Sequence, residues 1–281
     1  MSSPAPPSPA LLSSPALLYG TAWKKERTAS LVERALDLGF RGVDTACQPK
    51  HYDEPGVGAG VAACLARGLR REELYLQTKF TPLDGQDRRR LPYAADAPLR
   101  EQIEQSCAAS LRNLRVTHLD ALLLHSPISP RPRLLEAWRC FESLVGAGHV
   151  RALGISNCYD ADLLRSLCDA VSIPPSVVQN RFYADTGYDR LLRAVCRERG
   201  IRYQSFWTLT ANPHVLAHAA LVGIARRHAA TPAQVFFRYL ISIGITPLTG
   251  TTSEQHMRDD LSVMALTLSP DEGAEIARLL E

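Results

Sequence analysis

The sequence predicts an α/β fold of one domain, in which short strands alternate with helices. Eight apolar strand patterns are each followed by a stretch in which apolar residues recur with helical spacing. Strands separated by helices pair in parallel, and eight such units in 281 residues fit a closed (β/α)8 TIM barrel. A doubly wound open sheet is the structural alternative. It is disfavoured because no GxGxxG motif follows the first strand and its usual acidic partner is missing.

The elements follow one another along the whole chain. Residues 1–14 are rich in Pro, Ser and Ala, and we expect a disordered tail before a barrel that spans residues 15–281. The first helix places Leu31, Ala35 and Leu38 on one face, and Gly39 supplies the glycine that commonly ends helices. The predicted strands cover 16–19, 41–44, 74–79, 119–124, 150–155, 176–178, 201–205 and 245–248. The predicted helical segments cover 28–38, 56–66, 99–114, 134–146, 160–170, 188–199, 214–228, 232–242, 253–263 and 270–280.

Composition argues against several kinds of partner. A net charge of +3 is too small to indicate nucleic acid or a membrane surface, and Arg88-Arg89-Arg90 lies in a polar stretch typical of a solvated loop. No apolar run approaches the roughly 20 residues that span a bilayer, and the N-terminus lacks the pattern of a secretory signal. The cysteines are odd in number and have no CxxC spacing, which predicts reduced thiols in a cytoplasmic protein without a metal site. They are Cys47, Cys64, Cys107, Cys140, Cys158, Cys168 and Cys196.

Polar residues directly follow most of the predicted strands. In a barrel of this type the carboxyl ends of all strands meet at one mouth, where functional groups gather. We therefore expect these side chains to share a site. The strand ends are Gly20-Thr21, Asp44, Lys79, His125, Ser156-Asn157, Gln179, Phe206 and Gly250-Thr251.

Asp44, Lys79 and His125, together with Tyr52 of the first long loop, form a coherent proton-transfer set. Taken singly, each residue has an ordinary explanation. Asp44 would cap a turn, and Lys79 would be a solvated lysine. His125 would be a hydrogen-bonded core histidine, and Tyr52 would pack through its ring. Together, an ammonium held by a carboxylate stabilises a phenolate, and a neutral imidazole orients a carbonyl oxygen. Such a site protonates an oxygen that receives electrons elsewhere. A soluble hydride carrier is the natural electron source.

These residues carry a family resemblance. From about Leu17 to the end, the chain resembles the aldo-keto reductases, which are NAD(P)(H)-dependent carbonyl reductases on a (β/α)8 barrel. The resemblance implies that Tyr52 is the general acid, that Lys79 held by Asp44 lowers its pKa, and that His125 orients the carbonyl. It rests on the order and spacing of residues 39–46, Glu54-x-x-Val57-Gly58, Gln77-Thr78-Lys79, Leu123-Leu124-His125, Gly154-Ile155-Ser156-Asn157 and Gln179-Asn180.

The resemblance also implies a site for NADP(H) or NAD(H). Ser156, Asn157 and Gln179 would hold the nicotinamide carboxamide, and Phe206 stands where the family usually has a tyrosine stacked on the ring. The expected substrate-pocket wall is Trp23, His51 and Trp207. The residues expected at the cofactor are Gly20, Thr21, Asp44, Ser156, Asn157, Gln179, Phe206, Trp207, Leu209, Gly250, Thr251, His256 and Asp260.

The chain departs from the family pattern in the loop after Asp44. The family tyrosine usually lies five positions after the aspartate, whereas Tyr52 lies eight after, which implies about three inserted residues. Counting back from Glu54 puts His51 in the tyrosine's place instead. We expect Tyr52 to be the acid because an insertion can bulge outward and the chemistry needs a phenol; His51 is the alternative acid.

Two further departures concern the residues that bind the 2′-phosphate of NADPH and the two ends of the chain. The lysine and arginine that usually hold the 2′-phosphate of NADPH are absent, and His256 stands in place of the arginine. Arg258 is a candidate substitute, but the sequence does not show which way its side chain points. Thr251, Thr252 and Ser253 would still provide an anion site at a helix N-terminus, so NADPH preference, NADH preference and dual use all stay open. The family's N-terminal hairpin is not obvious and its long C-terminal loop is nearly missing, which predicts an open pocket with broad specificity.

We expect a monomeric enzyme that reduces a small aldehyde or ketone. The alternative from another class is a cofactor-binding regulatory or interaction subunit of the same fold with little turnover. A barrel hydrolase or isomerase with Asp44 as base ranks last, because the sequence offers it no metal site or nucleophile.

Overall fold

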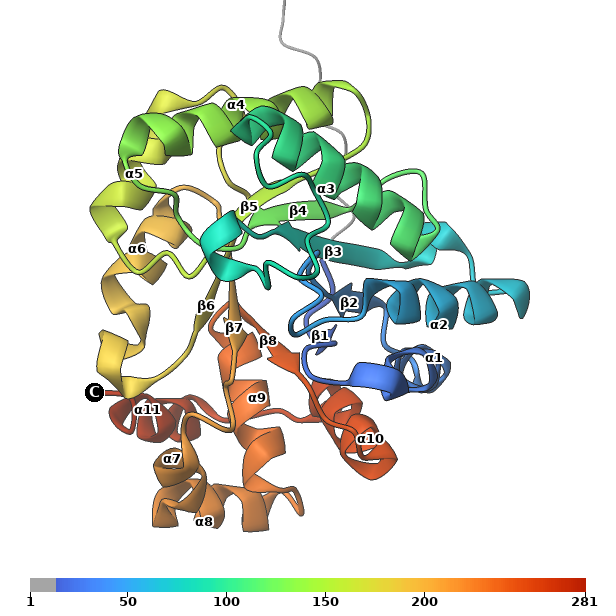
Figure 1. Cartoon of the computed structure of the whole chain (residues 1–281). Helices are drawn as coiled ribbons and strands as arrows, with labels where there is room; N and C mark the ends of the chain where they lie inside the picture. The colour runs from blue at the N-terminus through green and yellow to red at the C-terminus, as the bar shows by residue number, and fades with distance from the viewer. Residues whose placement is uncertain (1–13) are drawn as a thin grey trace, which may run out of the picture.

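A computed structural model describes residues 14–281 of the chain. Eight parallel strands close into a barrel in sequence order, because β1 pairs with both β2 and β8 (Figure 1). This confirms the predicted (β/α)8 barrel. The strands are β1 Leu18–Gly20, β2 Gly42–Asp44, β3 Tyr75–Phe80, β4 Ala121–Leu124, β5 Leu153–Ser156, β6 Val177–Arg181, β7 Arg202–Phe206 and β8 Ile245–Thr249.

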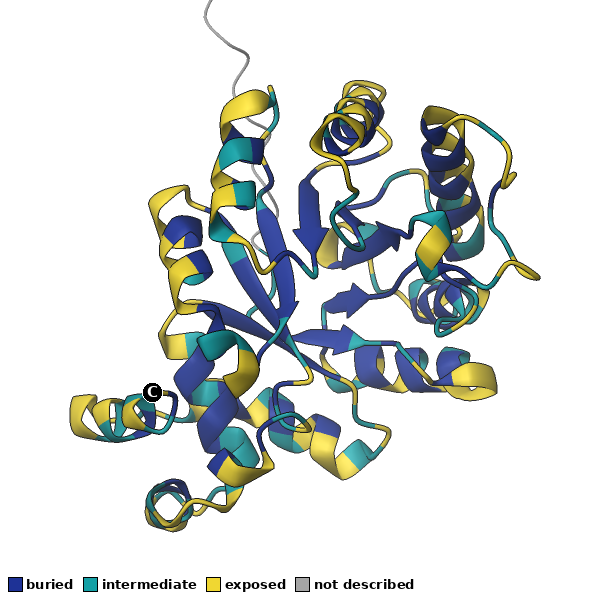
Figure 2. Ribbon diagram, turned by 60° about the vertical axis from the view of Figure 1, so that its left-hand side comes forward, coloured by how far each residue is buried: buried dark blue, intermediate teal, exposed yellow. Residues whose placement is uncertain are grey.

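The helices form an outer ring around the strands. Figure 2 shows the strands buried at the centre, with each surrounding helix buried on its inner side and exposed on its outer side. This pattern follows from the helical spacing of the apolar residues. The helices are α1 Thr28–Leu38, α2 Glu54–Ala66, α3 Leu99–Leu114, α4 Arg131–Gly146, α5 Ala161–Ala170, α6 Arg190–Glu198, α7 Pro213–Ala217, α8 Ala219–Arg227, α9 Pro232–Ser242, α10 Glu254–Ser262 and α11 Pro270–Arg278.

Strand alternation divides the interior into two regions. On β3, Leu76 and Phe80 join the large apolar cluster that includes the inner faces of the helices, whereas Tyr75 joins a second, smaller cluster. Successive side chains point to opposite faces of a strand, so Gln77 and Lys79 share the face of Tyr75. The smaller cluster holds Leu18, Tyr75, Ala121, Leu123, Ala152, Val177 and Leu248. Polar side chains therefore occupy this inner face towards the carboxyl ends of the strands.

Most element boundaries differ from the sequence-based prediction by a few residues, and three of the differences have a clear local cause. Helix α2 begins at Glu54 rather than residue 56 because Asp53 caps it, with Oδ1 accepting a hydrogen bond from the Gly56 N–H at 3.0 Å. Helix α6 begins at Arg190 because Tyr188 and Asp189 adopt positive φ angles of 52° and 51°. The predicted helical segment 214–228 is interrupted at His218, whose extended backbone separates α7 from α8.

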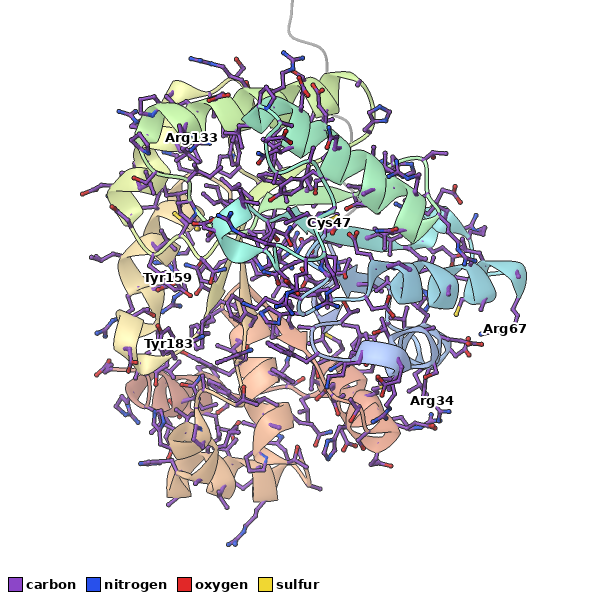
Figure 3. All side chains as sticks on the ribbon, viewed as in Figure 1. Arg34, Cys47, Arg67, Arg133, Tyr159 and Tyr183 are labelled. Atoms are coloured by element: carbon purple, nitrogen blue, oxygen red, sulfur yellow. The ribbon has the colours of Figure 1, made fainter. Side chains whose placement is uncertain are left out.

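Residues 1–13 of the predicted tail lie outside the described part of the chain; Ser14 accepts a hydrogen bond from Arg202 through its carbonyl oxygen, at 3.0 Å. All seven cysteines are buried free thiols. Figure 3 shows Cys47 towards the interior and Arg34 and Arg67 at the periphery. Within residues 14–281, no helix combines the length and the apolar character needed to cross a membrane.

Candidate active site

A buried ion pair lies at the carboxyl ends of β2 and β3. The Lys79 ammonium donates hydrogen bonds to both carboxylate oxygens of Asp44 at 2.7 Å and to the Thr45 carbonyl at 2.8 Å. Lys79 and Asp44 are 1% and 3% exposed, so neither charge would be tolerated alone. Burial lowers the pKa of Lys79, and the adjacent Asp44 carboxylate opposes that shift. All three ammonium protons are directed at these oxygens.

Three glutamine side chains form a hydrogen-bonded layer around this pair. Gln77 and Gln179 each donate to Asp44 Oδ1, at 2.7 and 2.9 Å, and each donates to Gln204 Oε1 at 2.8 and 2.9 Å. Gln204 donates in return to Gln77 Oε1 at 2.9 Å. The three glutamines come from β3, β6 and β7, and together they fix the orientation of the Asp44 carboxylate. Asp44 and Gln179 were both predicted at the site, whereas Gln77 and Gln204 were not.

Tyr52 lies between Lys79 and His125. The Lys79 ammonium is 5.4 Å from the centre of the Tyr52 ring, and the His125 and Tyr52 rings are 6.0 Å apart in an edge-to-face arrangement. Within residues 14–281 no hydrogen bond joins Lys79 to the Tyr52 hydroxyl. Burial, helped by the Asp44 charge, raises the pKa of Tyr52 above its usual value of 10.0. This direction is opposite to the lowering that was expected from Lys79, because burial disfavours the charged phenolate and the Asp44 carboxylate adds to that effect.

The residues before Tyr52 form the turn that accommodates the insertion. Cys47 extends β2 by pairing with Phe80, and the N–H groups of His51 and Tyr52 both donate to the Gln48 carbonyl at 3.0 Å. The His51 ring packs on Trp23, with centres 3.9 Å apart, and both residues line the cavity described below. Tyr52 lies next to Lys79 and His125, and which of the two residues donates the proton stays a prediction.

His125 follows β4 and faces the same cavity. Its Nδ1 lies 2.6 Å from the Thr81 hydroxyl. Burial, reinforced by the positive charge of Lys79, lowers the pKa of His125 to about 3. The imidazole is therefore neutral at physiological pH, as the sequence analysis expected.

One cavity of about 810 Å³ connects these groups with most of the other predicted residues. Thr252 and Ser253 of the predicted anion site do not line it, and neither do two of the residues predicted for catalysis or cofactor binding. Lys79 lies beneath the surface of the cavity, and Thr21 donates its hydroxyl to the Asp44 carbonyl at 2.9 Å. The predicted residues that line it are Gly20, Trp23, Asp44, His51, Tyr52, His125, Ser156, Asn157, Gln179, Phe206, Trp207, Leu209, Gly250, Thr251, His256 and Asp260.

Ser156, Asn157 and Gln179 are held at neighbouring strand ends. The Ser156 hydroxyl donates to the Gln179 carbonyl at 2.7 Å, and the Asn157 amide donates to the His125 carbonyl at 2.8 Å. Within residues 14–281 the Gln179 Oε1 accepts no hydrogen bond. Beside them, Phe206 ends β7 and contributes an aromatic ring to the cavity wall. This end of the cavity fits an amide attached to a flat ring.

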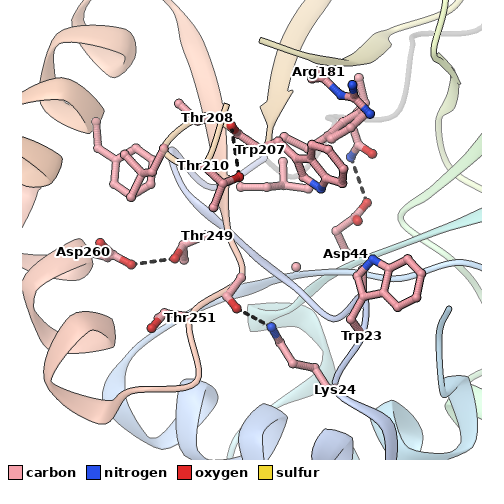
Figure 4. Close-up of a pocket in the computed structure, with 18 of the residues that line it drawn as sticks. Trp23, Lys24, Asp44, Arg181, Trp207, Thr208, Thr210, Thr249, Thr251 and Asp260 are labelled. Carbon is pink, nitrogen blue, oxygen red and sulfur yellow. Dashed lines mark hydrogen bonds between the residues drawn. The ribbon is translucent and has the colours of Figure 1, made fainter. Parts of the chain in front are cut away.

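The opposite end carries both basic and acidic groups. Asp260, Thr249 and Thr251 lie on one side of the view in Figure 4, with Lys24 below them and Trp23, Trp207 and Arg181 on the other side. The Lys24 ammonium donates to the Gly250 carbonyl. Asp260 accepts from the Thr249 hydroxyl at 2.6 Å. Arg258 pairs with Glu254 at 2.7 Å and does not line the cavity, so it does not replace the missing arginine there.

Several cavity residues were not identified from the sequence, and two of them, Lys24 and Arg181, are cations. Lys24 follows the first strand, and Arg181 is the last residue of β6. The sequence could have predicted Arg181 as a cavity residue, because strand alternation places it on the same face as Gln179, two positions earlier. It could not have predicted Lys24, because the first strand gives no indication of how the following loop folds.

The geometry agrees with comparisons to known proteins. The aldo/keto reductase family model matches residues 16–214 and 210–281. The chain belongs to the aldo/keto reductase family. The uncharacterized oxidoreductase YtbE of Bacillus subtilis is 29% identical over 251 residues, which is 89% of this chain and 82% of YtbE. The family consists of NAD(P)H-dependent oxidoreductases, so a nicotinamide dinucleotide is the cofactor of this chain.

Solved structures share the fold. An aldo-keto reductase from a Medee basin deep-sea metagenome, MGS-M4, superposes with a TM-score of 0.80 at 24% identity, covering 95% of this chain and 91% of that one. The silkworm (Bombyx mori) aldo-keto reductase AKR2E5, solved in complex with NADPH, gives a TM-score of 0.76 at 24% identity, covering 94% of this chain and 84% of that one.

Proposed function

We propose that this aldo/keto reductase reduces an aldehyde or ketone, with Tyr52 as the proton donor. The observation that carries the proposal is the position of Tyr52 at the cavity, between the buried Lys79–Asp44 pair and the neutral His125. Because its pKa is raised, the Tyr52 hydroxyl holds its proton at neutral pH until an alkoxide forms. In the tautomer in which the Thr81 hydroxyl donates to Nδ1, His125 carries Nε2–H and donates it to the carbonyl oxygen.

The nicotinamide cofactor, when bound, supplies the hydride. Gln179 Oε1 would accept from its carboxamide, with Ser156 and Asn157 beside it and the Phe206 ring against the nicotinamide. Lys24 and Thr251 would face the phosphates. Asp259 and Asp260 line the same end, and their charge opposes a 2′-phosphate, so we propose that the enzyme accepts NADH at least as well as NADPH. Monomeric state and cytoplasmic location remain predictions from the sequence.

The test is oxidation of NADH or NADPH by purified protein in the presence of 4-nitrobenzaldehyde. We expect turnover with the wild type and a loss of about 10²–10⁴-fold in kcat for Tyr52→Phe, the range of general acid catalysis. His51→Ala is the matched control and keeps most of the kcat. If His51→Ala loses activity and Tyr52→Phe does not, the proton donor is wrongly assigned. Cofactor binding without turnover of several aldehydes and ketones would favour a regulatory or interaction subunit.

A further inference from the structure

Arg181 occupies a position in the cavity wall that the proposed proton transfer does not use. It is the last residue of β6 and lies on the inner face of the strand, two residues beyond Gln179. At about 3.3 Å per residue, its Cα lies roughly 7 Å further towards the mouth of the barrel. Figure 4 shows Arg181 next to Trp207, on the side of the cavity away from Asp260 and Thr251.

Aromatic rings hold the Arg181 guanidinium in place. Its central carbon lies 4.1 Å from the centre of the Trp207 ring and 5.1 Å from that of Tyr183. The backbone is anchored too, since the Arg181 N–H donates to the Tyr159 hydroxyl at 3.2 Å. Figure 3 shows Tyr159 and Tyr183 on the same side of the barrel, near α6. A stacked guanidinium loses little further freedom when it binds a ligand.

No carboxylate neutralises this guanidinium within residues 14–281. Arg181 takes part in none of the ion pairs there, and its Nε is buried without a hydrogen-bond partner. The cavity carboxylates lie elsewhere: Asp44 is paired with Lys79, and Asp259 and Asp260 line the opposite end with Thr251. Arg181 lines the cavity, and a guanidinium without a carboxylate partner favours a bidentate oxyanion.

We propose that Arg181 binds the carboxylate of a carbonyl substrate whose apolar body lies between Trp23 and Trp207. The preferred substrate is then an aldehyde or ketone that carries a carboxylate several ångströms from its carbonyl group. This inference rests on the proposed carbonyl reduction and names the substrate class. Both tryptophans are exposed at the cavity, by 58% and 49%, so an aromatic or alkyl body can contact their free faces.

The experiment compares 4-carboxybenzaldehyde with its uncharged relative, methyl 4-formylbenzoate. The wild type should have the higher kcat/KM for the carboxylate. Arg181→Gln should reduce kcat/KM for the carboxylate at least tenfold more than for the ester, mainly through KM, because it removes a charge-assisted hydrogen-bonding pair. Arg139→Gln, the same change at an exposed position on α4, should alter neither value.

Other outcomes overturn the inference and identify the reason. Equal losses for both substrates, with weaker NADH binding, would mean that Arg181 holds cofactor phosphates. No preference in the wild type and no effect of Arg181→Gln would limit its role to packing Trp207. If neither aldehyde is turned over, the proposed function fails. Quenching of tryptophan fluorescence by benzoate against benzamide then tests Arg181 separately: equal affinities in the wild type would overturn the carboxylate site.

Discussion

At the scale of single residues, two buried carboxyl groups in one cavity have different partners. Asp44 faces an ammonium and two amides, whereas Asp260 accepts one hydroxyl hydrogen bond, from Thr249 at 2.6 Å. Burial raises the pKa of Asp260 from 3.8 to about 6. An uncompensated carboxylate disfavours folding when it is ionised. Asp260 therefore ought to reduce stability at neutral pH.

We expect Asp260→Asn to be more stable than the wild type at pH 7.5, by roughly 1–3 kcal/mol. Because the folded-state pKa is raised, the cost of ionisation is fully present above pH 6 and vanishes below pH 3.8. The advantage of the variant should therefore shrink between pH 6 and pH 4. Urea unfolding of both proteins across this range measures it, with the exposed Asp96→Asn as control. A difference independent of pH would refute the explanation by ionisation.

At the scale of elements, the contact between α2 and α3 depends on the absence of a side chain. A Cβ on Gly58 of α2 would lie 2.0 Å from the Asn113 carbonyl oxygen of α3. Asn113 and Ser110 of α3 also donate hydrogen bonds to the buried side chain of Glu54, the first residue of α2. The loop bearing Tyr52 leads directly into this helix. Close packing of two helices therefore supports the position of the proposed acid.

Gly58→Ala should destabilise the protein by about 2–4 kcal/mol, since a rigid backbone atom blocks the added methyl group. Gly273→Ala is the matched control: it also lies in a helix, α11, but an added methyl group there would have no atom within 4 Å. At that position alanine should stabilise the protein by about 0.5–1 kcal/mol. Chemical denaturation measures both changes. Equal effects of the two substitutions would show that helix propensity alone is being measured.

At the scale of the whole molecule, closure of the barrel brings distant strand ends into one cavity. Gly20 of β1 and Thr249 of β8 both line it, because these two strands pair. A ligand that spans the cavity contacts residues from several strands at once. Cofactor binding should therefore stabilise the fold as a unit.

We expect NADH at about 100 times its Kd to add about 2.7 kcal/mol of stability and to raise Tm by roughly 5–10 °C. NADPH should reach the same shift at a similar or higher concentration, since Asp259 and Asp260 line the cavity near the proposed phosphate site. Thermal melting at increasing concentrations of each nucleotide gives both results. A tenfold tighter response to NADPH would contradict the proposed effect of these carboxylates.

The sequence by itself determined the order of strands and helices, the closed barrel and most cavity residues. Helices over residues 28–38, 99–114 and 232–242 were predicted with the bounds observed, because apolar spacing is encoded locally. Strand ends such as Asp44, His125 and Gln179 were predicted to share a site because parallel closure puts all carboxyl ends at one mouth.

The Lys79–Asp44 pair was expected from the sequence, but only the tertiary structure decided how the other groups in that mouth pair. It directed a Lys79 proton to the Thr45 carbonyl, turned Thr21 away from the cavity and left the Arg181 guanidinium beside Trp207 without a carboxylate among the described residues. The left-handed backbone of Tyr188 and Asp189, which shortens α6, also has no local signal, because neither residue is glycine. Hydrogen-bond partners and burial depend on residues far apart in the chain, so local patterns do not specify them.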